Sequence, residues 1–190
     1  FGAGGPAVSL NRANGGRKPV RVELLVVDDL THSAMNRAEV ICETTRSAFE
    51  ALEQTALEVR FGYLGARDRD YGEADELRVV HGTAAQVLRE QMTVTRAGGG
   101  DAAEPFGDTL LDALDNYPFT HAADVVGAVL LLCTDDSKPT AAGLSMQEVG
   151  ERFRQARKHV FVVGEPGSNT EAIVEGAGAF GGGFLPLKAN

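Results

Sequence analysis

The stretch Val22-Glu23-Leu24-Leu25-Val26-Val27-Asp28-Asp29-Leu30-Thr31-His32-Ser33 decides the fold of this chain. Its apolar run from Val22 to Val27 predicts a central strand of a parallel sheet, in which both faces of the strand are covered. Asp29, Thr31 and Ser33 then follow at intervals of two residues. Such a turn can direct a carboxylate and two hydroxyls, which are hard oxygen ligands suited to Mg²⁺ or Mn²⁺, toward one point. Because short turns of this composition also cap helices, the interpretation needs support from other segments.

Strand patterns alternate with helix patterns along the rest of the chain. We expect strands at 20–27, 57–66, 77–80, 125–133, 160–163 and 184–187. We expect helices at 34–56, 83–92, 146–157 and 170–175, and a further helix opened by the glycine loop 97–101. This alternation predicts an α/β fold with a doubly wound, mostly parallel central sheet flanked by helices. Residues 1–18 are rich in Gly, Asn and Arg and are interpreted as a flexible lead-in, so that residues 19–190 form one domain.

The composition restricts the class of partner. The 190 residues are 43% hydrophobic and 24% charged, which is typical of a globular domain large enough to bury a core. A formal net charge of −9 argues against nucleic acid, because phosphate binding requires a basic face. No apolar run approaches the roughly 18 residues needed to cross a bilayer, so we expect no membrane segment.

The two cysteines and the first residues of the sequence give information on the cellular compartment of the protein. Cys42 and Cys133 have neither metal-site nor disulfide spacing and are interpreted as small core residues in a reducing compartment. No signal peptide is recognised, so a cytoplasmic location is favoured. The sequence starts at Phe1, so it is also compatible with a piece of a longer chain from which a leader has been lost. Its richness in Ala, Arg and Gly favours a bacterial source with a high-GC genome.

Two later segments carry oxygen donors at positions where they can meet the first loop. Gly98-Gly99-Gly100-Asp101 places a carboxylate after glycines that allow a sharp turn and a close approach of the backbone. Thr134-Asp135 directly follows the most apolar strand of the chain. Ligands of doubly wound sheets bind at the carboxyl ends of the strands, so we expect the three loops to converge there.

Together these segments resemble the von Willebrand factor type A (vWA) domain with its metal-ion-dependent adhesion site (MIDAS). The family carries Asp-x-Ser/Thr-x-Ser after its first strand, which Asp29, Thr31 and Ser33 match. The segment 98–101 fits a bacterial branch with Gly-Gly-Gly-Asp, and Thr134-Asp135 matches the Thr-Asp of the family's fourth strand. Looser likenesses extend the pattern over residues 20–187.

The resemblance implies a metal-ion-dependent binding module for protein–protein or protein–ligand interaction, and not an enzyme. The implied metal-site residues are Asp29, Thr31, Ser33, Asp101 and Asp135. Hydroxyls would coordinate Mg²⁺, or Mn²⁺ or Ca²⁺, while Asp29 and Asp135 would mostly hold its waters and orient the hydroxyls. One open coordination position would accept an Asp or Glu of a protein partner.

The sequence departs from the family pattern at four places. His32 replaces a usual Gly, Met35 stands one place later than the usual Met, and Ala103 replaces a common Pro. The sequence ends at Asn190, and we therefore expect the last helix of the family to be missing.

A receiver domain that accepts a phosphoryl group is the alternative. Val26-Val27-Asp28-Asp29 resembles its paired acids, Asp68 lies where the phospho-accepting Asp would be, and Lys138-Pro139 matches its late Lys-Pro. Thr134 and Lys138 share one loop here, however, whereas a receiver places the corresponding residues on separate strands.

The remaining polar residues have simpler interpretations. The segment 67–70, Arg-Asp-Arg-Asp, is predicted to be a solvated, salt-bridged loop. Asp28 and Asp136 neighbour the predicted ligands but are expected to point away from the site or into loop caps. Surface or capping positions are expected for His81, His121 and His159.

Overall fold

The computed structural model describes residues 21–55, 58–99 and 103–187. The described strands form a six-stranded sheet in the order β3-β2-β1-β5-β7-β8, in which β3 alone runs antiparallel to its neighbour. The strands of this sheet are β1 (Arg21–Asp29), β2 (Glu58–Ala66), β3 (Glu76–Gly82), β5 (Val125–Leu132), β7 (His159–Gly164) and β8 (Gly181–Pro186). A second, two-stranded parallel sheet joins β4 (Ala103–Glu104) to β6 (Asp136–Ser137).

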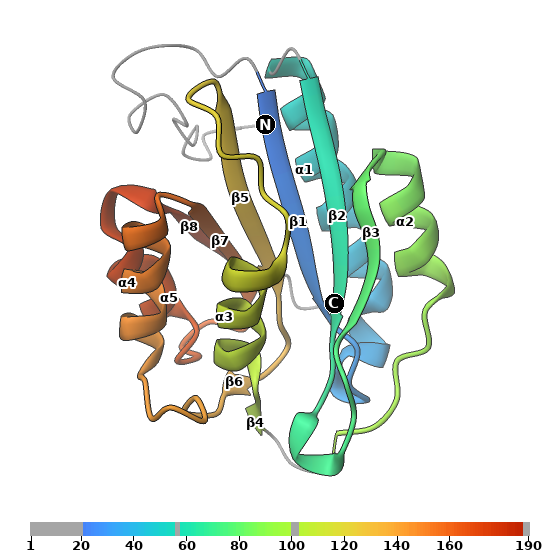
Figure 1. Cartoon of the computed structure of the whole chain (residues 1–190). Helices are drawn as coiled ribbons and strands as arrows, with labels where there is room; N and C mark the ends of the chain where they lie inside the picture. Colours follow the sequence, from blue (N-terminus) through green and yellow to red (C-terminus); the bar gives the residue numbers. More distant parts are fainter. Residues whose placement is uncertain (1–20, 56–57, 100–102, 188–190) are drawn as a thin grey trace, which may run out of the picture.

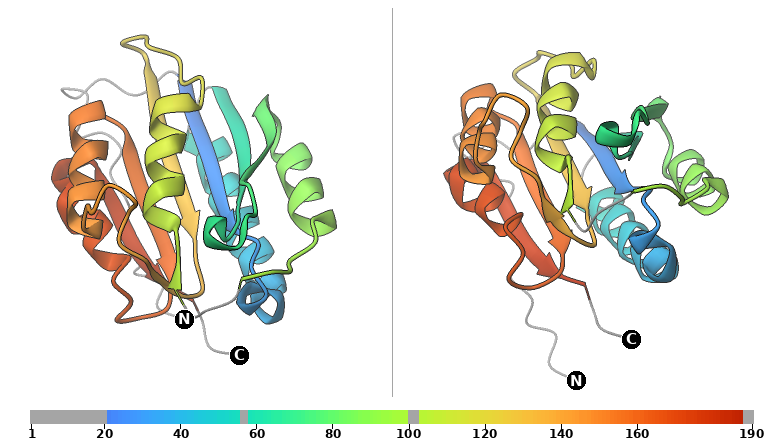
Figure 2. Two further views of the ribbon diagram at one scale, coloured as in Figure 1. Left: turned by 60° about the horizontal axis from the view of Figure 1, so that its bottom comes forward. Right: turned by 90° about the horizontal axis from the view of Figure 1, so that it is seen from below.

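Helices cover both faces of the large sheet (Figures 1 and 2). One face packs against α1 (Ala38–Thr55) and α2 (Ala84–Thr93). The other packs against α3 (Phe106–Asn116), α4 (Met146–Ala156) and α5 (Glu171–Ala177). This arrangement confirms the predicted doubly wound, mostly parallel α/β fold. Within the described ranges, no helix is both long enough and apolar enough to cross a membrane.

The central strand β1 is buried on both faces, as its apolar run from Val22 to Val27, interrupted only by Glu23, predicts. Leu25 and Val27 join the core beneath α3, α4 and α5, whereas Leu24 and Val26 join the core beneath α1 and α2. Each of these four side chains is at most 3% exposed. The strand therefore fixes the position of both helical layers and carries Asp29 to the sheet edge.

The element boundaries differ from the sequence predictions at two points near the site. A 3₁₀ helix, η2 (Ser33–Arg37), precedes α1, so the α-helix begins at Ala38 instead of Ala34. The short strand β4 separates the glycine loop from α3, so this loop does not itself open the helix. Both differences place irregular backbone where the parallel strands end.

The predicted surface position of His159 is wrong, and the segment 67–70 forms salt bridges as predicted but is not fully solvated. His159 is buried at the start of β7, with its ring centroid 5.3 Å from that of Phe180, so it is not a surface residue.

Within the segment 67–70, Asp68 is fully buried, with its Oδ1 atom 3.3 Å from Lys138 Nζ. The guanidinium of Arg67 donates to the carbonyl oxygens of Thr95 and Ala97. The segment 67–70 therefore belongs partly to the interior, and hydrophobic patterning could not show this.

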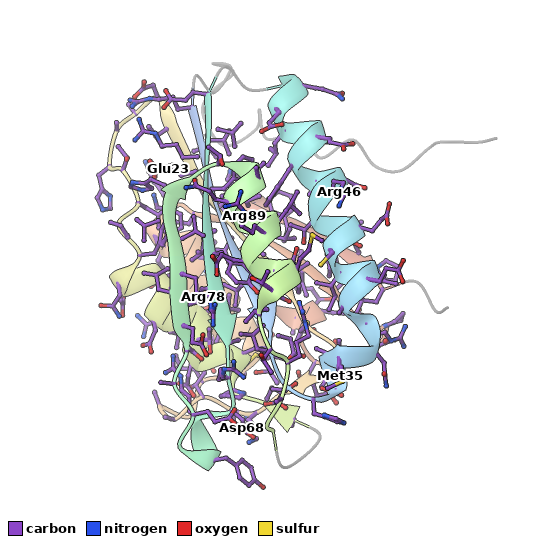
Figure 3. The ribbon with its side chains drawn as sticks, turned by 90° about the vertical axis from the view of Figure 1, so that its right-hand side faces the viewer. Glu23, Met35, Arg46, Asp68, Arg78 and Arg89 are labelled. Carbon is purple, nitrogen blue, oxygen red and sulfur yellow. The ribbon has the colours of Figure 1, made fainter. Side chains whose placement is uncertain are left out.

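The carboxyl ends of β1, β2, β5 and β7 lie at the lower end of the molecule in Figure 1, together with β4 and β6. In Figure 3, Met35 and Asp68 lie at this end, and Glu23 lies at the opposite end. The polar loops that follow the strands are thereby brought to one edge.

Two glycines allow α4 and α5 to pack with their backbones in contact. A Cβ atom at Gly150 would lie 2.0 Å from the Ile173 carbonyl oxygen, and one at Gly176 would lie 1.9 Å from the Gln147 carbonyl oxygen. Neither backbone atom can move without displacing its helix.

We predict that Gly150→Ala destabilises the protein by about 1–3 kcal/mol through overpacking. The sign of the change in unfolding free energy tests the close packing, because Gly→Ala inside an unobstructed helix stabilises by about 0.5–1 kcal/mol. Urea unfolding of wild type and Gly150→Ala measures the difference. Gln155→Ala, at an exposed position of the same helix, is the control and should stay within about 0.5 kcal/mol of wild type. A stabilised Gly150→Ala variant would contradict the close packing of the two helices.

Candidate functional site

The Asp29 carboxylate connects the loops that follow two neighbouring strands. Its Oδ1 atom accepts hydrogen bonds from the Thr31 backbone N–H at 2.9 Å and from the Thr31 hydroxyl at 2.6 Å. Its Oδ2 atom accepts from the Thr134 hydroxyl at 2.7 Å and from the Thr134 N–H at 3.3 Å. Burial raises the pKa of Asp29, and these hydrogen bonds act in the opposite direction.

Three hydroxyl groups form a continuous chain beside this carboxylate. Thr31 Oγ1 lies 2.9 Å from Ser33 Oγ, and Ser33 Oγ lies 3.2 Å from Thr134 Oγ1. Thr31 and Thr134 both donate their hydroxyl protons to Asp29. Ser33 can donate its one proton to either of these oxygens, so lone pairs of the hydroxyl oxygens remain available on the side away from the carboxylate.

Asp135 completes the second loop. Its Oδ2 atom lies 3.2 Å from Thr134 Oγ1 and is the longer branch of the bond that this hydroxyl donates to Asp29, and the residue is half-buried. Ser33 is exposed, while Asp29 and Thr31 are buried. The cluster therefore faces solvent at Ser33 and Asp135, where a ligand can reach it.

Asp136 points away from the cluster, as the alternation of strand residues predicts. Its Oδ1 atom accepts from the Asn169 N–H at 2.8 Å, which fixes this loop to the start of α5. Asp28 also points away, and its carboxylate is buried against the opposite sheet face. It accepts from Arg96 Nη2 at 2.6 Å and from the Tyr63 hydroxyl at 2.8 Å.

The glycine loop lies against the first loop through backbone hydrogen bonds. Ala97 N–H donates to the Leu30 carbonyl at 2.9 Å, and His32 N–H donates to the Gly98 carbonyl at 3.1 Å. Gly99 has a positive φ of 74°, and a Cβ atom there would lie 3.2 Å from Thr31 Cβ. Asp101, the fifth predicted metal-site residue, lies outside the described residues, so its metal role stays a prediction.

The ion pair between Arg96 and Asp28 holds this loop in place. Both side chains are almost completely buried, and Arg96 immediately precedes Ala97. Burial raises the pKa of Asp28 to about 6, although Arg96 and Tyr63 act to lower it. The pair thus ties the glycine loop to the same strand that carries Asp29.

Glu104, which the sequence reasoning did not identify, extends the acidic part of the site. It is 2% exposed, and its Oε1 atom would lie 3.0 Å from a Cβ atom at Gly99. Burial and the nearby carboxylates of Asp29 and Asp68 raise its pKa to about 8, while Lys138 acts to lower it. A single Glu before a proline carries no specific sequence signal, so tertiary structure was needed to find it.

This donor set fits a hard divalent cation. It combines three hydroxyls with the carboxylates of Asp29 and Asp135, and it lies beside the buried Glu104. Such oxygen donors suit Mg²⁺, Mn²⁺ or Ca²⁺. Among the described residues, no three His, Cys, Asp or Glu side chains come together as ready-made metal ligands. Hydroxyl groups would therefore have to supply much of the coordination.

Comparison with known proteins finds similar folds among solved structures but no match by sequence. A scan against protein-family models and a search of curated proteins give no match. The VWA domain of SpRpn10 superimposes with a TM-score of 0.68 at 11% identity, covering 88% of this chain and 89% of that one. Proximal thread matrix protein 1 from the mussel byssus, whose structure has a zinc-occupied MIDAS motif, gives a TM-score of 0.64 at 14% identity.

The second match covers 88% of this chain but 42% of the mussel protein, so the chain spans less than half of that relative. At these identities the likeness concerns the fold. The chain is an α/β protein of the doubly wound class. Within that class it has the fold of the VWA domains.

We predict that the stability of the metal-free protein depends on pH through Glu104. The folded state holds this proton up to a pKa of about 8, whereas an unperturbed Glu titrates near 4.5. Unfolding therefore releases a proton between these values, and the contribution of Glu104 to stability falls as the pH rises through this window.

Thermal melts in EDTA at several pH values measure this effect. The melting temperature of Glu104→Gln relative to wild type should increase steadily from pH 5 to pH 8. Glu50→Gln, at an exposed position of α1, should stay parallel to wild type throughout. A constant difference between Glu104→Gln and wild type would contradict the raised pKa.

Proposed function

We propose that this domain binds another protein through a divalent metal ion held at the carboxyl edge of its sheet. The observation that carries the proposal is the single hydrogen-bonded cluster of Asp29, Thr31, Ser33, Thr134 and Asp135, built from two loops that are distant in sequence. A VWA-fold relative with a zinc-occupied MIDAS motif supports it.

Each residue has a role that its contacts support. Asp29 orients Thr31 and Thr134 by accepting their protons, which leaves their oxygens for the ion. The exposed Ser33 would contribute a third hydroxyl, and Asp135 would hold a water of the ion. Asp101 would add a carboxylate, in keeping with the Gly-Gly-Gly-Asp branch that the sequence resembles. Mg²⁺, Mn²⁺ or Ca²⁺ would then supply an open coordination position for a partner's Asp or Glu.

Binding is proposed in preference to catalysis. The hydroxyls of Thr31 and Thr134 are engaged in orienting contacts with Asp29. Burial raises the pKa of the neighbouring Cys133 thiol to about 12, so this residue is a poor nucleophile. His32, which adjoins the cluster, is exposed and is better placed to contact a partner than to orient a nucleophile.

The receiver alternative has one contact in its favour, because Lys138 Nζ lies 3.3 Å from Asp68 Oδ1. Two observations oppose it. Receivers belong to the doubly wound order 2-1-3-4-5, whereas this sheet has the order β3-β2-β1-β5-β7-β8 with an antiparallel edge strand. Asp68 is also completely buried, where a phosphodonor cannot reach it.

We predict that Mg²⁺ or Mn²⁺ raises the melting temperature of the wild-type protein. At an ion concentration of about 100 times Kd, stabilisation is about 2.7 kcal/mol, which corresponds to several degrees for a chain of this size. Asp29→Ala and Asp135→Ala should each abolish the shift, because each removes a carboxylate of the cluster. Melts with Mg²⁺ and with EDTA measure it.

Asp136→Ala is the matched control for this experiment. It removes an acid one position away that hydrogen-bonds Asn169 instead of the cluster. Its metal-free melting temperature should fall slightly, while its Mg²⁺-dependent shift should equal that of wild type. If wild type and all three variants respond equally to Mg²⁺, the ion does not bind at the proposed site.

We predict that a small phosphodonor such as acetyl phosphate, supplied with Mg²⁺, does not phosphorylate the protein. Intact-mass spectrometry and a phosphate-affinity gel detect the modification, with a known receiver domain as the positive control. A phosphoryl group on Asp68 that disappears in Asp68→Asn would replace the binding-module proposal with the receiver function.

A further inference from the structure

Glu104 is a buried carboxyl group whose ionised form is poorly compensated by the described residues around it. Its side chain is 2% exposed, and within the described part of the chain its Oε2 atom is buried without a hydrogen-bond partner. Asp29, Asp68 and Asp135 all oppose its ionisation, whereas Lys138, which also lies 3.3 Å from Asp68, favours it. Burying an uncompensated charge is costly unless a counter-charge is supplied.

A capping role does not explain Glu104. It lies just before α3, where an acid can stabilise the helix N-terminus. The helix, however, begins after Pro105 with no side-chain cap hydrogen bond. Glu104 therefore contributes no direct hydrogen bond to the first turn of the helix.

The backbone holds Glu104 firmly beside the hydroxyl cluster. In the small β4–β6 sheet, its carbonyl oxygen accepts from the Lys138 N–H at 2.8 Å. A Cβ atom at Gly99 would approach both Glu104 Oε1 and Thr31 Cβ, at 3.0 and 3.2 Å. Glu104 and Thr31 therefore flank the same small volume, and the glycine leaves it open.

We propose that Glu104 is a further cation-holding residue of this site, so that Glu104 together with the neighbouring hydroxyls lets the chain retain a divalent ion before any partner binds. This inference rests on the proposed function and adds a residue outside the adhesion-site pattern of the sequence. A cation beside Glu104 would compensate the charge of this buried carboxyl group, whose Oε2 atom has no hydrogen-bond partner among the described residues. Partner binding would then use an ion already resident in the domain.

The test is isothermal titration of the metal-free protein with Mn²⁺ in 0.15 M salt at pH 8.5, combined with melts in EDTA. We expect Glu104→Gln to weaken Mn²⁺ binding about 10- to 100-fold, as loss of a residue that supports a metal site does. The same variant should melt at a higher temperature than wild type in EDTA, because it removes a buried charge. A merely structural role for Glu104 would lower that melting temperature instead.

The variant Asp136→Asn distinguishes the specific position of Glu104 from a general effect of negative charge near the site. It removes one negative charge next to Asp135, but its side chain faces Asn169. We expect its Mn²⁺ affinity to stay within about threefold of wild type, since exposed charges are screened. Equal losses in Asp136→Asn and Glu104→Gln would overturn the inference, as would a Glu104→Gln affinity within twofold of wild type.

Asp29→Ala makes the two possible failures distinguishable. If wild type binds Mn²⁺ and Asp29→Ala does not, the proposed site stands, and the Glu104→Gln affinity alone decides the further inference. If wild type does not bind Mn²⁺, the proposed function and the role of Glu104 fail together.

Discussion

The site depends on the Asp29 carboxylate, which accepts hydrogen bonds from two loops at once. Oδ1 accepts hydrogen bonds from Thr31 and Oδ2 accepts them from Thr134, so both oxygens of this buried carboxylate have donors. A buried carboxylate is tolerated only when its charge is compensated by such donors. The arrangement orients the hydroxyls with their protons inward, which is the orientation that a cation requires of them.

The surrounding structure keeps these loops in register. Parallel pairing of β1 with β5 sets Asp28 opposite Leu132, so the loops that follow the two strands leave the sheet side by side. The buried pair of Arg96 and Asp28 ties the glycine loop to the other side of β1. Breaking a buried pair of this kind is expensive because the remaining charge is uncompensated. Stability and site geometry therefore depend on the same interactions.

Several buried acids accumulate at this edge of the sheet. Asp29, Asp68 and Glu104 are all at least 98% buried, and the basic side chain of Lys138 lies near them. In a medium of reduced dielectric constant such groups repel each other strongly. A bound divalent cation would convert this repulsion into attraction, which links the acidity of the interior directly to the proposed function.

The sequence by itself determined the alternation of strands and helices, the central strand at Val22–Val27, and the candidate donors Asp29, Thr31, Ser33 and Asp135. These follow from local patterns, because apolar periodicity and turn chemistry depend on neighbouring residues. The tertiary structure decided that Thr134 shares the Asp29 carboxylate, that Asp68 is buried, and that Glu104 lies beside Thr31. These contacts join segments far apart along the chain, and their geometry is set by sheet register and helix packing. Neither the sheet register nor the helix packing can be predicted from a local sequence pattern.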